Sequence, residues 1–428
     1  MAIYLKKFST HAEYEAYIAS EDKVLPNVSI CTTEGDVHYN PYVSHDYSQD
    51  YFTMVVTVGG NIKWSGSTTS NTLSYSKDNG ENWSAVTTAN TISVEAGDNV
   101  LWKGTLTPQS NKGIGRFSGA TNVRYSVEGN AMSLLFGDGF KGKTSLEGRN
   151  YALYGLFFGN TNVTSAESLS LLATTLESNC YTSMFNGCTN LTTAPELPAT
   201  TLAQNCYSSM FYNCTSLTTA PELPATTLAS GCYNNMFWGC TSLTTAPELP
   251  ATTLVSKCYS SMFQGCTSLT TAPELPATTL ADWCYGVMFQ GCTSLTTTPE
   301  LPATTLVSNC YSSMFKDCTS LTTAPELPAT TLADKCYSYM FKGCTSLTTA
   351  PELPATTLAT SAYTYMFDGC TSLSSIKCLA TNISASYCTT NWVKGVASSG
   401  TFTKASSMSS WTNGVNGIPN GWSVQDAA

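Results

Sequence analysis

Apolar residues recur along most of the chain in one fixed pattern. The segment LTTAPELPATTLAQNCYSSMFYNCTS begins at Leu191, and close copies of it begin every 26 residues further on. Eight copies cover residues 165–372, and a degenerate ninth runs from Leu373 to about Ser398. A period between about 20 and 50 residues is typical of proteins whose stacked units share one core. We therefore predict an α+β repeat fold, a solenoid, over residues 165–398.

The spacing of the apolar positions changes within one unit. In CYSSMFYNC, the residues Cys206, Met210 and Cys214 fall four apart, which predicts a short helix with one apolar face. Pro195 and Pro198 exclude a helix from LTTAPELP and cannot donate to a sheet ladder. Each unit should be an extended arm with about two to four residues of strand at LTT, then a corner and a short helix. The recurring apolar positions, in one unit, are Leu191, Ala194, Leu197, Leu202, Cys206, Met210, Phe211 and Cys214.

The motif MFYNCTSL…LP…L resembles a known repeat family. Its apolar pair, cysteine and following Ser-Leu resemble the BspA-type bacterial leucine-rich repeat, also called the Treponema type. The match recurs eight times and covers roughly half of the chain. The resemblance implies a right-handed solenoid with short strands and short helices, and a role in adhesion or recognition. Repeats of the TTAPELPATTLA form also occur in phage, prophage and surface proteins of anaerobic gut bacteria.

The segments on either side of the repeats have different patterns. Residues 1–45 are predicted to be an N-terminal attachment segment with one short helix, because Thr10 and Glu13 make a capping box. This opening resembles N-terminal segments of some phage structural proteins. Residues 131–164 should form an N-terminal cap of the solenoid. Residues 399–428, with Trp411 and Trp422 among turn residues, should cap its other end.

Residues 46–130 carry several short β-type runs. YFTMVVTV, TLSYS, TISVEAG and NVLWKGTL are rich in β-branched and aromatic residues and are separated by turn residues such as Asn79-Gly80. Strands at this spacing predict a small antiparallel β-sandwich. Trp64, Trp83 and Trp102 are expected in its core.

A formal match to the phosphate-binding P-loop lies in FGDGFKGKT. Gly137, Gly142, Lys143 and Thr144 fit the motif. A P-loop joins a strand to a helix in a parallel sheet. AMSLLF and RNYALYGLFF could supply the strand and the helix, but the upstream pattern is antiparallel. Nucleotide binding is therefore only a minor alternative, and the glycines are expected to form a loop of the cap.

Cysteines occur in pairs, eight residues apart, in seven of the units. On a continuous helix such residues are about 12 Å apart, too far for a disulfide. Ala362 takes the first position of one pair, and Asn160 takes the second position in an imperfect upstream unit. We predict ladders of buried free thiols. Whether Cys378 pairs with Cys388 stays open.

Composition and charge limit the functions that this chain can have. The net charge of −10 argues against binding nucleic acid, and no apolar run predicts membrane insertion. The first residues lack the apolar core of a secretory signal, so we expect the chain to be made in the cytoplasm. All three histidines, His11, His38 and His45, lie outside the repeats, and no catalytic motif occurs. We expect no enzyme, no catalytic residue, no cofactor and no metal.

Two sets of positions are expected on the surface of the repeats. A glutamate of PELP recurs from Glu196 to Glu352, and such a ladder of like charges must face solvent. The residues before the first cysteine and after Met-Phe vary between copies. Either they are solvated positions whose residues vary without constraint, or they form a ligand-binding face with aromatic anchors. The candidate ligand-binding residues are Tyr212, Trp238, Gln264, Trp283, Gln290, Lys316 and Lys342.

These observations favour recognition over catalysis. Our first hypothesis is a phage tail or appendage protein in the virion, attached to other tail proteins through its N-terminal segments. The solenoid would contact a glycan or a protein on the host surface. The alternative is a bacterial cell-surface adhesin of the same repeat family. A homo-oligomer is compatible with either.

Overall fold

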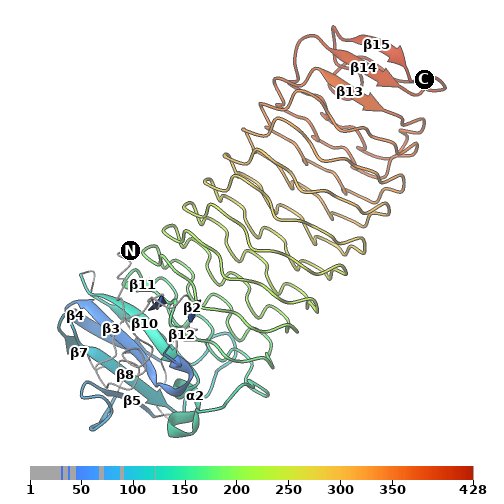
Figure 1. The fold of residues 1–428 in the computed structure, drawn as a ribbon. Helices are drawn as coiled ribbons and strands as arrows, with labels where there is room; N and C mark the ends of the chain where they lie inside the picture. Colours follow the sequence, from blue (N-terminus) through green and yellow to red (C-terminus); the bar gives the residue numbers. More distant parts are fainter. Residues whose placement is uncertain are drawn as a thin grey trace.

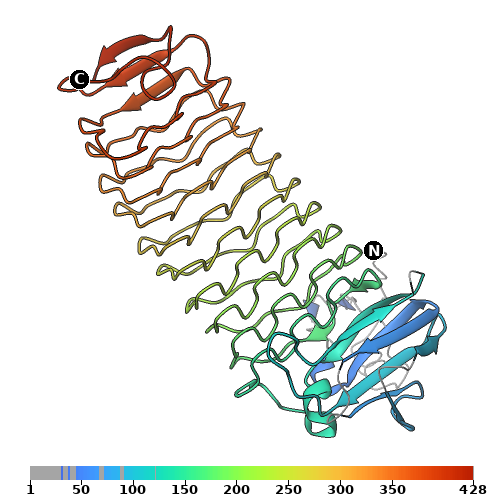
Figure 2. The same ribbon diagram turned by 180° about the vertical axis from the view of Figure 1, so that it is seen from behind.

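The computed structural model describes residues 30–31, 37–38, 45–66, 72–86, 91–120 and 122–427. A β-rich domain lies at one end of a long stack of coils, and a small sheet lies at the other end (Figure 1). The same arrangement is seen from behind in Figure 2. The helix predicted from the capping box of Thr10 and Glu13 lies outside the described residues. Strands β1 (Ile30–Cys31) and β2 (Val37–His38) form an antiparallel pair.

The β-rich domain consists of two sheets. One has the order β11-β10-β3-β8-β5-β6, in which β11 is Val163–Ser165, and the other has the order β7-β4-β9. The ring centre of Phe117, in the second sheet, lies 4.7 Å from that of Trp102 and 5.8 Å from that of Phe52, both in the first sheet. The two sheets therefore pack face to face. The short 3-10 helix η1 (Tyr47–Gln49) precedes the strands. The strands are β3 (Phe52–Val58), β4 (Gly60–Ser65), β5 (Leu73–Ser76), β6 (Ser84–Ala85), β7 (Thr91–Val94), β8 (Asn99–Gly104), β9 (Arg116–Gly119) and β10 (Arg124–Asn130).

Two of the three tryptophans expected in the core of this domain are buried. Trp64 and Trp102 are at most 1% exposed. Trp83 is only half-buried, and the Lys103 ammonium lies 4.1 Å from the centre of its ring. The expectation for Trp83 was therefore wrong. Trp83 lies between the Asn79-Gly80 turn, where both residues have positive φ, and the two-residue edge strand β6.

The β-rich domain joins the repeats through a shared sheet. Strands β11 (Val163–Ser165) and β12 (Leu169–Ser170) both pair in parallel with β10. The side chain of Asn160 donates hydrogen bonds to the Phe117 carbonyl at 2.9 Å and to the Tyr125 hydroxyl at 2.8 Å. The imperfect unit upstream of the first repeat is therefore tied to both sheets of the domain.

The P-loop alternative is wrong. The predicted strand is a four-residue helix, α2 (Ser133–Phe136), followed by a 3-10 turn, η2 (Gly137–Gly139). The predicted helix after the motif is a series of turns at residues 150–159. The motif therefore lies between a short helix and a series of turns, without the flanking strand and helix that a P-loop requires. Asp138 within the motif accepts hydrogen bonds from the Tyr51 hydroxyl and the Lys103 ammonium, at 2.6 and 2.8 Å.

The short helix expected in each coil is also absent. Residues 205–214 form consecutive turns, in which Asn205, Ser209 and Asn213 have φ of 52–55°. A left-handed residue at every fourth position breaks a helix. Alternate amides donate within the turns, as from Met210 to the Tyr207 carbonyl at 3.2 Å. The amides between these donate to carbonyls of the next coil, as the Phe211 amide does to the Met236 carbonyl at 2.9 Å. Consecutive coils are thus hydrogen-bonded side by side through their turns.

Pairing at LTT is shorter than predicted. The position is right, because Thr219 bridges to Thr245 and Thr245 to Thr271 in parallel. Most coils, however, contribute one bridging residue there instead of the two to four expected. The prolines of PELP remove amide donors on the C-terminal side, which limits the ladder. Longer strands appear at this position in two units whose sequence lacks PELP: β11 (Val163–Ser165) at the start of the repeats and β13 (Ser375–Cys378) in the ninth coil.

The repeated apolar residues form continuous ladders in the core. Met210 and Phe211 are fully buried, and the equivalent residues of the other coils are buried as well. Phenylalanine rings stack from Phe185 to Phe367 with centroids 5.6–5.8 Å apart and tilts of 8° or less. A tyrosine ladder, from Tyr181 to Tyr363, is equally buried and was not among the predicted core positions.

The cysteines are buried free thiols, as predicted. The seventeen that the structure describes are all unpaired and buried, and these include Cys378 and Cys388. In the second ladder each thiol donates to a phenylalanine carbonyl of the preceding coil, as Cys266 does to Phe237 at 3.1 Å. Asn160, which takes this position upstream, likewise donates to the carbonyl of Phe117. A shared donor role explains why asparagine and cysteine interchange here.

The C-terminal end of the stack is covered by a small parallel sheet. Its strands are β13, β14 (Thr401–Lys404) and β15 (Ser423–Asp426). Trp411 stacks on Trp392 of the ninth coil with centroids 5.6 Å apart, and the Trp422 indole donates to the Ala397 carbonyl at 2.7 Å. These contacts shield the last coil from water. Among the described residues, no helix is both long and apolar enough to span a bilayer.

Candidate functional site: the turn face

The consecutive turns of all coils lie together and form one side of the stack, which we call the turn face. Along each turn segment two buried residues alternate with two outward ones. In the second coil Cys206, Tyr207, Met210 and Phe211 point inward. The residues between and beside these pairs point outward and occupy equivalent positions in successive coils. The turn face is therefore a set of columns that run along the stack.

Three of these columns carry most of the variation. The first column is Tyr151, Asn179, Asn205, Gly231, Lys257, Trp283, Asn309, Lys335, Ser361 and Tyr387. The middle column is Gly155, Ser183, Ser209, Asn235, Ser261, Val287, Ser313, Tyr339, Tyr365 and Asn391. The third column is Phe158, Asn186, Tyr212, Trp238, Gln264, Gln290, Lys316, Lys342, Asp368 and Lys394.

The candidate residues named from the sequence all lie on the turn face. Trp283 belongs to the first column and is half-buried. The other six are half-buried members of the third column: Tyr212, Trp238, Gln264, Gln290, Lys316 and Lys342. Tyr212 and Trp238 touch, with ring centroids 5.1 Å apart. The structure thus brings two of the three predicted anchors together and leaves Trp283 in a separate place.

Five further aromatic residues of the turn face were missed. Tyr339 and Tyr365 belong to the middle column, and the other three, Tyr151, Phe158 and Tyr387, belong to irregular coils at the two ends. Together with the three predicted anchors they form what we call the aromatic track. Its members are Tyr151, Phe158, Tyr212, Trp238, Trp283, Tyr339, Tyr365 and Tyr387.

The C-terminal part of the track is the most elaborate. The rings of Tyr339 and Tyr365 stack with centroids 4.9 Å apart and a tilt of 9°. The Lys342 ammonium lies 5.7 and 5.1 Å from the centres of these rings and forms an ion pair with Asp368 at 2.8 Å. The Asn391 amide donates to the Tyr365 hydroxyl at 2.9 Å. These contacts hold the two rings in place.

Several track residues occupy backbone that disfavours them. Tyr151, Trp283, Tyr339, Tyr365 and Tyr387 have φ between 54° and 62°. Left-handed backbone costs a bulky side chain about 1–2 kcal/mol, and asparagine or glycine tolerates it better. Other coils place Asn, Gly, Ser, Lys or Val at the same positions. An aromatic residue here therefore carries a backbone cost that asparagine or glycine would avoid, and strain of this kind is concentrated at functional sites.

Comparison with known protein families identifies the repeat family of this chain. The profile described as "BspA type Leucine rich repeat region" matches residues 157–286 and 285–392, with six copies. The two matches together span more than half of the chain. The chain belongs to the BspA-type leucine-rich repeat family. No curated protein sequence matches it.

The other outward surfaces of the BspA-type repeats are uniform. The glutamate ladder, from Glu196 to Glu352, is exposed in every coil, as predicted. Its last member forms an ion pair with Lys377 at 2.8 Å. Threonine, proline and glutamate fill these surfaces, and the described coils place no aromatic residue there. In the part of the chain that the structure describes, no group of three or more His, Cys, Asp or Glu residues could hold a metal ion.

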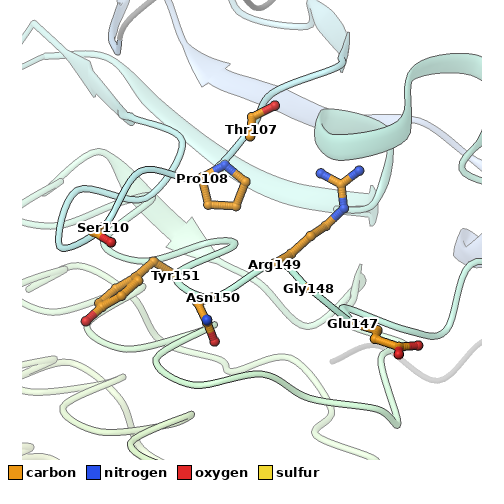
Figure 3. A pocket seen from close by; sticks show the side chains of 8 residues that line it. All are labelled: Thr107, Pro108, Ser110, Glu147, Gly148, Arg149, Asn150 and Tyr151. Carbon is orange, nitrogen blue, oxygen red and sulfur yellow. The ribbon is translucent and has the colours of Figure 1, made fainter.

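A hollow of about 440 Å³ lies where the track begins, between residues 147–151 and the loop after β8. Tyr151 lies at one end of it and Glu147 at the other, with Arg149 between them (Figure 3). The Arg149 guanidinium lies 4.4 Å from the centre of the Phe136 ring. The remaining lining residues are Thr107, Pro108, Ser110, Gly148 and Asn150.

The backbone cost of a track residue can be measured at Tyr387, which is 72% exposed and has φ of 59°. Replacing it with asparagine, the residue at position 309 of the same column, is expected to raise the free energy of unfolding by about 0.5–1 kcal/mol. Guanidinium unfolding monitored by circular dichroism measures the change. Tyr387→Ala is the matched control and should give no gain, since alanine also disfavours left-handed backbone. Equal stabilities of the two variants would contradict the explanation.

Proposed function

We propose that this protein is a non-enzymatic recognition or adhesion protein whose turn face contacts a ligand on a cell surface. Membership of the BspA-type family, which indicates a surface or adhesion type of repeat protein, supports this. The observation that carries the proposal is the aromatic track. Five of its members are held in unfavourable backbone on a stack whose other surfaces are uniform. Half-exposed Tyr and Trp side chains are typical anchors of binding interfaces.

We further propose that the protein belongs to a phage tail or appendage, made in the host cytoplasm and attached to other tail proteins through its N-terminal segments. The stacked coils would act as a solenoid rod that carries the turn face to the host. The resemblance of the repeats and of the N-terminal segment to phage proteins supports this. So does a core of free thiols, which is compatible with folding in a reducing compartment. The alternative is a bacterial cell-surface adhesin, which the family itself favours.

Mass spectrometry of two preparations, purified virions and the envelopes of uninfected cells of the same host, separates these roles. Detection of the protein in purified virions, at a constant ratio to a known tail protein, is expected for the phage role. Detection in the cell-envelope fraction of uninfected, prophage-free cells would instead support the adhesin. Absence from virions would contradict the phage role.

Attachment through the turn face can be tested by replacing its aromatic residues with the residues that other coils have at equivalent positions. The double variant Trp238→Gln, Trp283→Asn takes its new residues from positions 264 and 309 of the same columns. We expect binding to host cells to weaken about tenfold or more, as loss of interface anchors usually does. Binding of fluorescently labelled protein to cells, measured by flow cytometry, gives the affinity.

The control is Glu248→Gln on the glutamate ladder, which should bind as the unchanged protein does. Circular dichroism should show that both proteins keep the repeat fold. Unchanged binding of the double variant would mean that the variable columns are only solvated surface.

A further inference from the structure

We infer that the aromatic track binds an extended, uncharged glycan chain that lies along the stack of coils. This inference rests on the proposed function and adds the class of the ligand. Four features of the turn face lead to it: the course of the track, the chemistry of its columns, the balance of its charges and the fixed positions of its rings.

The track has the course of a site for a long polymer. Its residues begin upstream of the first repeat at Tyr151 and end in the ninth repeat at Tyr387, with Tyr212, Trp238 and Trp283 between. Tyr212 and Trp238 belong to successive coils, and so do Tyr339 and Tyr365, whose ring centroids lie 5.1 and 4.9 Å apart respectively. A ligand that contacts several of these places must be extended and must run along the stack. A linear chain of repeated sugar units has this shape.

The chemistry of the columns suits sugars better than a folded protein. Outside the aromatic residues the three columns contain Ser, Asn, Gln, Gly, Lys and Asp, and their only aliphatic side chain is Val287. The core of a protein interface is rich in Met and Arg and poor in Lys. The described columns contain neither methionine nor arginine. Aromatic faces pack against the apolar C–H faces of sugar rings, while amides and hydroxyls pair with their hydroxyl groups.

The charges on the turn face favour an uncharged chain. The Lys342 ammonium forms an ion pair with the Asp368 carboxylate, and the Lys316 ammonium lies 3.9 Å from the Asp317 carboxylate. Asn309 donates to Asp282 beside the first column at 3.2 Å. The turn face thus carries five lysines and four aspartates close together. Their charges nearly cancel, so the face has no strong positive or negative electrostatic potential. The residues are Lys257, Lys316, Lys335, Lys342 and Lys394, with Asp282, Asp317, Asp334 and Asp368.

The rings are also fixed in advance. The backbone of the turn face is hydrogen-bonded from coil to coil, and Tyr339 and Tyr365 are stacked and held by Lys342 and Asn391. Rings that are already ordered lose little conformational entropy when a ligand binds. Weak contacts can therefore add up along a long chain, and affinity should rise with the length of the glycan.

The first test compares host cells treated with sodium periodate, which oxidises sugar diols, with cells treated with proteinase K. The intact protein is expected to bind protease-treated cells normally and periodate-treated cells at least tenfold more weakly. Binding that proteinase K removes and periodate leaves would overturn the glycan inference while the proposed function stands. If the unchanged protein binds no host cells before treatment, the proposed function and the inference both fail.

The second test uses the neutral polysaccharide extracted from these cells and its fragments of graded length as competitors. Competition should strengthen at least tenfold from short to long fragments and persist in high salt, which screens charge. The variant Tyr339→Ser, Tyr365→Ser takes its residues from position 313 of its column and should lose at least tenfold in affinity. Glu326→Gln is the matched control. No competition by the neutral fraction, or competition only by a charged fraction at low salt, would overturn the inference.

Discussion

Raising the pH from 8 to 10 in the presence of a reductant is expected to unfold the BspA-type repeats. Burial raises the pKa of the thiols of Cys180, Cys232 and Cys284 to about 12. It raises the pKa of Cys214 and Cys266 well above the ordinary value. The other thiols of the two ladders shift in the same direction for the same reason. The folded protein therefore keeps these protons at pH 10.

The unfolded chain releases them, because a cysteine in water has a pKa of about 8.5. Each thiol that is protonated only in the folded state costs about 1.4 kcal/mol of stability per pH unit above that value. Sixteen such thiols in the core would cost roughly 30 kcal/mol at pH 10, more than the usual ~5–15 kcal/mol that keeps a domain folded. This stability is fully present below about pH 8.5 and is lost as the pH rises.

Guanidinium titrations at several pH values between 7 and 10 measure this dependence. The matched variant replaces Cys232, Cys258, Cys284, Cys310 and Cys336 with alanine, the residue that the chain itself places at position 362. Five fewer thiols should reduce the slope of the unfolding free energy with pH by about a third. A fold that persists unchanged at pH 10.5, or an equal slope in the variant, would mean that the thiols are not buried in one cooperative core.

The repeat, its core and its free thiols could be predicted because a fixed period makes them visible. Each apolar position recurs in register, so Met210, Phe211 and Cys214 are identified many times over. The prediction of free thiols was right although its geometry was wrong. It assumed a helix between Cys206 and Cys214, whereas these residues lie on consecutive turns.

The turns could not be distinguished from a helix by apolar spacing alone, because both place inward residues four apart. The difference lies in the residues between them. Asn205 and Asn213, and Gly231 and Gly239 in the next coil, recur at the positions that take positive φ. Asparagine and glycine at a spacing of four and eight are typical of left-handed backbone, and this pattern would have indicated turns.

Most of the missed track residues lie where the register weakens. Tyr151 and Phe158 precede their counterparts Asn179 and Asn186 by 28 residues instead of 26. A search at the regular 26-residue period therefore does not align them with the columns. Tyr387 belongs to the degenerate ninth repeat. The P-loop match failed for a different reason: a short motif fixes only four side chains. The strand and helix that give it meaning depend on distant pairing, which the local sequence does not determine.

Replacing Phe263 with alanine is expected to lower the free energy of unfolding by about 3–5 kcal/mol, the usual cost of removing a buried aromatic side chain. Phe263 is fully buried, and its ring stacks between those of Phe237 and Phe289 at 5.6 and 5.7 Å. Its carbonyl accepts the thiol hydrogen bond of Cys292, and its amide donates to the Met288 carbonyl. A cavity here therefore loosens three adjacent coils.

Guanidinium unfolding gives the total loss, and hydrogen exchange of the amides in residues 237–292 shows whether it spreads to both neighbouring coils. Gln264→Ala, one residue further along on the turn face, is the control and should change stability by no more than about 0.5 kcal/mol. Because each coil contacts only its neighbours, the exchange rates of distant coils such as that of Phe185 should change far less. Equal stabilities of the two variants would mean that the phenylalanine ladder does not hold the stack together.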